Sequence, residues 1–238
     1  MFLWMIAALL AYFIKGLCGF ANSLIFSSIL SFGMNNINIT PVDVLLGYPT
    51  NMIMAWKGRK EIDWKVSLPL AFLVLLGNIP GIFLLKIGNA QVIKIFFGFV
   101  IIGIGIEMFF RERGTKKIKS SKWVLGVIGL LSGLLCGLYG IGALLAAYVS
   151  RVTDNSQEFK ANMCVVFTIE NTFRVILYLW MGILTIEVIK QVLLVVPFML
   201  IGLFVGMKSS SLLDEKMVKK VVIMMLIISG AALVVNNM

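Results

Sequence analysis

The sequence predicts an all-α polytopic membrane protein of about eight transmembrane helices, arranged as two four-helix repeats with broken leading helices. Three observations favour this fold class: the composition, the long runs without charge, and a partial repeat of the first half in the second. Of 238 residues, 60% are apolar and only 13% are charged, and the mean hydropathy is +1.02. Soluble chains are about 45–50% apolar and about 25% charged. The composition therefore favours a chain that lies in a lipid bilayer.

Four runs without charged residues meet or approach the length of about 20 residues that a bilayer-spanning helix needs. They cover residues 16–42, 66–85, 123–150 and 221–238. Weaker apolar segments at 41–56, 92–109, 161–181 and 185–207 bring the expected number of crossings to about eight. The N-terminal segment has no positive n-region and no small-residue cleavage site, so we expect a retained span and not a signal peptide.

Most charged residues lie in three blocks, at 57–65, 111–122 and 208–220. The net charge is +10, but the basic residues form short blocks between apolar runs, so they indicate topology and not nucleic-acid binding. Eight crossings with both termini in the cytoplasm place the first two blocks inside, in accord with the positive-inside rule, whereas the third block opposes that arrangement. We expect a multi-pass protein of the cell membrane (inner or plasma membrane).

The two halves of the chain share short motifs. Residues 17–20 read Leu-Cys-Gly-Phe and residues 135–138 read Leu-Cys-Gly-Leu. We expect a first repeat at 1–110, a basic cytoplasmic linker at 111–122 and a second repeat at 123–238. An even number of spans per unit makes the repeats parallel, whereas a re-entrant leading segment would make them inverted.

Each half begins with an apolar segment that is too long for one simple helix, because about 20 residues already span the hydrocarbon. The expected breaks lie at Lys15–Ser23 and in the glycine series Gly133, Gly137, Gly140 and Gly142. Matched breaks of this kind indicate a transporter's binding site, where a freed helix N-terminus attracts an anion. Gly19, Asn22 and Ser23 are candidates in the first break, and Tyr139 and Gly140 take that place in the second. Close helix packing is the alternative interpretation of the glycines, and the favoured one for Gly77/Gly81 and Gly202/Gly206.

These motifs resemble the sulfite exporter TauE/SafE family, whose halves each open with a glycine-rich motif. Here the motifs read KGLCGFANSLIFSSILSFG and LSGLLCGLYGIGALLAAYVS, and the following helices contain GYPTNMIMAWKGRKEIDW and VVFTIENTFRVILYLWMG. The chain departs from the family pattern at Ala21-Asn22 and Tyr139, where further glycines are common. The resemblance implies a secondary transporter for small, often sulfur-containing anions such as sulfite or organosulfonates.

The segment TIENTFRVILY places two ionisable residues, Glu170 and Arg174, inside an apolar span. Ionisable groups at that depth are costly and mark functional sites by default. Four residues apart on a helix, they share a face and can pair. We expect Arg174 to attract an anion and Glu170 to compete for it, so that protonation of Glu170 couples transport to protons. Asn171 and Thr168 lie near the same face, and a static structural pair is the alternative.

Other candidates offer hydrogen bonds or charge without a decisive pattern. Thr50 and Asn51, in the matching helix of the first half, suit oxyanion oxygens but can equally bond across helices. Lys15 is either an anion-attracting charge or a snorkelling residue at an interface. Cys18 and Cys136 occupy equivalent positions and either exchange with a sulfur-containing substrate or, as we expect, pack beside glycine.

Several function classes are excluded or disfavoured. The chain has no His and no cluster that pairs a nucleophile with a general base, so we expect no enzyme, no metal site and no cofactor. No Gly-x-x-x-x-Gly-Lys-Ser/Thr motif supports an ATP-driven pump. The expected partners are a small anion and the lipid bilayer, with homo-oligomerisation left open. The alternative function is a non-transporting structural or interaction subunit of a membrane complex.

Overall fold

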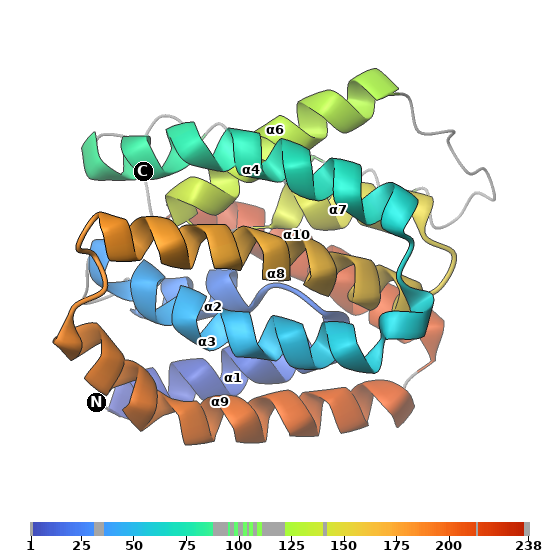
Figure 1. The fold of residues 1–238 in the computed structure, drawn as a ribbon. Helices are drawn as coiled ribbons and strands as arrows, with labels where there is room; N and C mark the ends of the chain where they lie inside the picture. The colour runs from blue at the N-terminus through green and yellow to red at the C-terminus, as the bar shows by residue number, and fades with distance from the viewer. Residues whose placement is uncertain are drawn as a thin grey trace.

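The computed structural model describes residues 2–30, 36–87, 122–139, 142–212 and 214–235, with a few separate residues between 95 and 110. Every element in these ranges is a helix (Figure 1). The helices are α1 (Phe2–Cys18), α2 (Asn22–Leu30), α3 (Asn36–Lys57), the short 3-10 helix η1 (Arg59–Glu61), α4 (Trp64–Ile87), α6 (Lys122–Tyr139), α7 (Ala143–Val152), α8 (Ser156–Trp180), α9 (Ile186–Leu212) and α10 (Glu215–Val235). The expected linker lies outside the described residues except for Lys122, and the division into two repeats stays a prediction.

By length and composition, 3 helices in the described residues can cross a membrane: Trp64–Phe83, Ser156–Trp180 and Ile186–Leu212. Phe2–Cys18 and Gly126–Gly137 are apolar but shorter. The all-helical membrane class is therefore confirmed, whereas the expectation of about eight full crossings is not. Part of the reason is the form of the two leading segments.

The first leading segment is a helical hairpin. At the turn, Gly19 and Ala21 adopt positive φ angles of 88° and 72° and reverse the chain. Helix α2 then runs back along α1, so that the rings of Phe26 and Trp4 lie 5.6 Å apart between centroids (Figure 1). The break lies where the sequence predicts it, and it turns the chain back on itself. Glycine suits such a turn because it has no Cβ to clash at positive φ.

The second leading segment has the same form. Helix α6 ends at Tyr139, and α7 begins at Ala143 and returns beside α6 (Figure 1). Leu135 and Cys136 of α6 pack in one apolar cluster with Leu144 and Leu145 of α7. Both halves of the chain therefore open with a helical hairpin.

Glycines bring helices from opposite halves of the chain together. A Cβ on Gly81 of α4 would lie 2.5 Å from the Leu134 carbonyl oxygen of α6, and one on Gly16 of α1 would lie 2.5 Å from the Leu203 carbonyl oxygen of α9. Only glycine permits such close backbone approach, as is common between membrane helices. The close-packing interpretation of the Gly77/Gly81 and Gly202/Gly206 pairs is confirmed, because these residues lie against α6 and α1 respectively.

The two hairpins enter from opposite ends of the bundle. Helices α4 and α6 run in the same direction, since Gly77 lies beside Leu130 and Gly81 beside Leu134. Helix α1 runs with α3, which leads into α4 and so runs opposite to it (Figure 1). Helices α1 and α6 are therefore antiparallel. Of the two repeat arrangements, this favours the inverted one.

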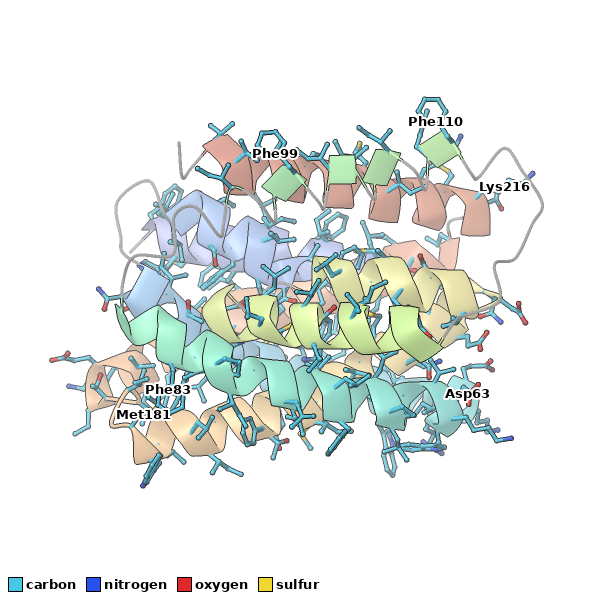
Figure 2. All side chains as sticks on the ribbon, turned by 90° about the horizontal axis from the view of Figure 1, so that it is seen from above. Asp63, Phe83, Phe99, Phe110, Met181 and Lys216 are labelled. Atoms are coloured by element: carbon cyan, nitrogen blue, oxygen red, sulfur yellow. The ribbon has the colours of Figure 1, made fainter. Side chains whose placement is uncertain are left out.

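One end of the bundle, which we call the basic end, is where α3 and α9 finish and where α4, α6, α8 and α10 begin (Figure 1). In Figure 2, Asp63 and Lys216 lie at this end, and Phe83 and Met181 lie at the other. The backbone N–H of Asp63 donates to Asn162 Oδ1 at 3.0 Å, which ties the start of α4 to the start of α8. Helices α1 and α3 begin, and α10 finishes, at the opposite end.

Candidate functional site

A small polar cavity, which we call the central cavity, lies between the α1–α2 turn and the middle of α3 and α8. Its volume is about 20 Å³, roughly the space that one water needs. Its lining residues are Lys15, Ala21, Asn22, Ser23, Leu24, Asp43, Val44, Gly47, Asn51, Gly142, Phe167, Glu170, Asn171 and Arg174. Such a concentration of polar groups between apolar clusters is costly, and in membrane proteins it marks a functional site.

Arg174 and Glu170 form the pair that the sequence predicts, on one side of this cavity. They are 1% and 2% exposed, and Arg174 Nη1 lies 3.4 Å from Glu170 Oε1. The same carboxylate oxygen accepts a hydrogen bond of 2.6 Å from Asn78 Nδ2. Arg174 Nη2 donates to the Tyr178 hydroxyl at 2.8 Å. Neighbours on α4 and α8 therefore hold both charged groups in place.

One nitrogen of the Arg174 guanidinium lacks a hydrogen-bond partner among the described residues. Arg174 Nε is buried and has no hydrogen-bond partner among the described residues, and the same is true of Asn51 Oδ1 on the facing helix α3. Both residues line the central cavity. A buried polar atom without a partner costs about 1–3 kcal/mol, so such atoms in a lined cavity point to a polar ligand.

A second acid and a second cation also line the cavity. Asp43 of α3 accepts hydrogen bonds at Oδ1 from the Tyr12 hydroxyl at 3.3 Å and from Asn22 Nδ2 at 3.1 Å. Lys15 of α1 is 1% exposed, and its Nζ donates to the Gly47 carbonyl oxygen at 3.4 Å. Lys15 is thus fully buried beside the cavity and does not snorkel to an interface.

These four groups set the electrostatics of the site. When all are ionised, the positive charges of Lys15 and Arg174 balance the negative charges of Asp43 and Glu170. An anion that enters this balanced site adds a net negative charge in a region of low dielectric, which is strongly unfavourable. Protonation of either carboxylate removes that excess charge. The arrangement can therefore take up an anion and a proton together.

The cavity gathers six of the site residues that the sequence predicts: Asn22, Ser23, Asn51, Glu170, Asn171 and Arg174. Thr50 and Thr168 do not belong to its lining, and their hydroxyls donate to carbonyl oxygens of their own helices, each at 2.7 Å. Gly19 forms the hairpin turn and lies against Lys160. Tyr139 is the last residue of α6, and Gly140 lies outside the described residues.

All three cysteines are buried, and none of them is among the lining residues of the cavity. Cys18 and Cys136 lie in an apolar cluster, as the packing interpretation predicts. No group of metal-binding side chains occurs in the ranges that the structure describes.

Sequence reasoning missed the residues that position the charges, namely Tyr12, Asp43, Asn78 and Tyr178. Asp43 gave a usable signal, because it is an ionisable residue within the expected span at 41–56. Asn78 lies inside a charge-free run, and its sequence signal is weak because asparagine carries no charge. The two tyrosines gave none, since their roles depend on which helices pack together.

Comparison with known proteins identifies the family of the chain. The family model of the sulfite exporter TauE/SafE matches residues 4–233. A protein of Cupriavidus necator named "Probable sulfite/organosulfonate exporter TauE" is 26% identical over 161 residues, which cover 66% of this chain and 62% of that protein. The aligned part thus spans less than two thirds of that relative's length. No solved structure matches significantly. Because the family model covers nearly the whole chain, this membrane protein belongs to the sulfite exporter TauE/SafE family.

Proposed function

We propose that the protein is a proton-coupled secondary transporter (permease) for a small oxyanion, with a sulfur oxyanion such as sulfite or an organosulfonate as the favoured substrate. The observation that carries the proposal is the unpaired donor of Arg174, which is buried in the wall of the central cavity that Lys15 also lines. Arginine binds oxyanions well because its planar group offers several fixed N–H donors. The family and the name of the relative from Cupriavidus necator support the choice of anion.

The size of the central cavity supports alternating access. A cavity of about 20 Å³ holds one water, and a sulfur oxyanion is larger. The space between the polar groups is therefore too small for the anion, and loading requires part of the wall to move. We expect the α1–α2 turn to move, because it forms one wall of the central cavity and leads into the short helix α2. In inverted-repeat transporters, motion of one repeat against the other opens a midplane site to each side in turn.

Uptake into proteoliposomes tests this proposal. We expect purified protein to carry labelled sulfite or an organosulfonate faster than acetate, and an imposed pH gradient to drive accumulation. The control is vesicles without protein. If well-folded protein carries none of these anions and none raises its melting temperature, the alternative of a non-transporting subunit is favoured.

We further propose that the basic end faces the cytoplasm and that both termini lie outside, which reverses the orientation that we expect from eight crossings. In the described residues, the basic end or the helical turns next to it hold Lys57, Arg59, Lys60, Lys65, Lys122, Arg151, Lys160, Lys208, Lys216, Lys219 and Lys220. The opposite end holds Lys86 and Lys190. By the positive-inside rule, the end of the bundle with this excess of Lys and Arg faces the cytoplasm. The hairpins change the loop assignment, because they bring 151–160 and 208–220 to the same end as 57–65.

Cysteine labelling in intact cells tests the orientation. The native cysteines are buried, so the background is low. We expect a membrane-impermeant maleimide to label Glu187→Cys, at the opposite end, and to label Lys216→Cys only after the cells are broken. The reverse pattern would place the termini in the cytoplasm.

A further inference from the structure

A second and larger cavity opens at the basic end, between the ends of α1, α3 and α9 and the start of α8. We call it the vestibule. Its volume is about 440 Å³. Its lining residues are Gly16, Met54, Lys57, Gly58, Gln157, Lys160, Ala161, Phe204, Met207, Lys208, Ser210 and Ser211. Three of them are lysines, and none of these described lining residues is acidic. The vestibule therefore holds concentrated positive charge together with hydroxyl groups.

Lys160 is the innermost of the three lysines. It is only 7% exposed, and its Nζ donates a hydrogen bond to the Ser210 hydroxyl. Lys57 Nζ lies 5.4 Å from the centre of the Phe204 ring. A hydroxyl and a ring face are weaker partners for an ammonium group than a carboxylate is. Two nearby acids are engaged elsewhere, since Glu158 Oε2 accepts from the Asp154 N–H and Asp63 Oδ1 from the Lys65 N–H.

The vestibule and the central cavity lie on two sides of the α1–α2 turn. Lys15 lines the central cavity and the next residue, Gly16, lines the vestibule. The stem of Lys160 lies directly against the turn, because a Cβ on Gly19 would be 2.9 Å from Lys160 Cγ. The end of α1 and its turn therefore lie between the two cavities.

We propose that the vestibule is a second anion-binding site, which holds the transported oxyanion at the basic end before or after it occupies the central cavity. This inference rests on the proposed function. The ligand is a small, solvated oxyanion that pairs with Lys57, Lys160 and Lys208 and accepts from Ser210 or Ser211. Binding competes with the contact between Lys160 and Ser210, and so acts on the residue that lies against the turn. Concentrated positive charge in a cleft also raises the local anion concentration and the rate of association.

The transport test removes two charges from the vestibule and leaves the central cavity intact. We expect Lys57→Gln/Lys208→Gln to raise the KM for labelled sulfite, measured from the basic end, by about tenfold, with little change in the maximal rate. The matched control is Lys216→Gln/Lys220→Gln, which removes the same charge from the same end but from residues outside the vestibule lining. Equal effects of the two double variants would overturn the proposal in favour of general surface charge.

The phosphate of an anionic lipid headgroup is also an oxyanion and is the alternative ligand of the vestibule. Both double variants are therefore compared in phosphatidylcholine vesicles and in vesicles that contain phosphatidylglycerol. A free oxyanion site predicts the KM effect in both lipids. An effect that appears only with the anionic lipid would overturn the proposal in favour of a lipid headgroup.

Equilibrium dialysis with labelled sulfite separates failure of this inference from failure of the proposed function. In detergent, we expect Arg174→Gln/Glu170→Gln, which removes both charges of the buried pair, to lose binding at the central cavity and to keep binding at the vestibule. Adding Lys57→Gln/Lys208→Gln should abolish the rest. Binding that survives all four changes would overturn the vestibule site, as would complete loss in Arg174→Gln/Glu170→Gln alone. Vestibule binding without any flux in the wild type would instead contradict the proposed function.

Discussion

Arg174→Gln is expected to reduce sulfite flux in proteoliposomes by about 10- to 100-fold, because a hydrogen bond to a charged group contributes about 1.5–3 kcal/mol and each 1.36 kcal/mol corresponds to about a factor of ten. Arg174 is the only arginine among the described residues that line the central cavity, and its Nε is the unpaired donor. Arg174→Lys should also lose most flux, because the three donors of lysine leave from one nitrogen and cannot reach the separate positions at which the guanidinium contacts Glu170, Tyr178 and the cavity.

Loss of folding must be separated from loss of transport. Glutamine at 174 leaves Glu170 as a buried acid without its cation, which is strongly destabilising. The double variant Arg174→Gln/Glu170→Gln removes both charges and should elute from size exclusion like the wild type while still carrying no sulfite. Arg59→Gln is the control, since Arg59 lies at the basic end and stacks on Trp56, 4.7 Å from the ring centre. Flux in the folded double variant within about twofold of the wild type would contradict a role for Arg174, because it corresponds to less than about 0.5 kcal/mol.

The sequence predicts the charged pair in the central cavity because its signal is local. Glu170 and Arg174 interrupt an apolar run at helical spacing, so both their depth and their shared face follow from the sequence. Asp43 is also buried, and it lies within the expected span at 41–56, but it is only the third residue of that span, so its depth in the membrane is less certain from the sequence than that of Glu170. Its role depends on the hydrogen bonds from Tyr12 and Asn22, which exist only once α1, α2 and α3 have packed.

The hairpins show a similar limit. Glycines and an interrupted apolar run predict where each leading segment breaks, but they do not predict the direction of the chain after the break. That direction depends on positive φ angles at Gly19 and Ala21 and on the contact of Phe26 with Trp4. This direction determines the number of membrane crossings. It also determines the relative orientation of the two repeats and the side of the membrane on which the termini lie. The choice of helix partners, α1 with α9 and α4 with α6, depends on glycine surfaces that look alike in sequence.

Glu170→Gln is expected to abolish accumulation driven by a pH gradient while leaving downhill flux of sulfite measurable. In the wild type, Glu170 Oε1 accepts from both Asn78 Nδ2 and Arg174 Nη1. Its ionised form therefore neutralises Arg174, and protonation frees Arg174 for the anion. Wild-type binding should strengthen as pH falls, because the proton and the anion enter together. Glutamine keeps the shape of the side chain without the negative charge, so anion binding in the variant should lose this pH dependence.

The size of the effect follows from the gradient. When one proton accompanies one anion with no net charge movement, a gradient of one pH unit supports about tenfold accumulation, since one unit corresponds to about 1.36 kcal/mol. The wild type should approach that ratio, and Glu170→Gln should equilibrate without accumulation. The control, Glu187→Gln, removes an exposed acid at the start of α9 and should behave like the wild type.

Asp43→Asn provides the decisive comparison, because Asp43 is the other acid in the central cavity and can also take up the proton. If Glu170 is the coupling group, Asp43→Asn alters the affinity for sulfite but keeps gradient-driven accumulation. If Asp43→Asn abolishes accumulation while Glu170→Gln retains it, the coupling role belongs to Asp43. In that case the Glu170–Arg174 pair is the static structural pair that the sequence leaves open.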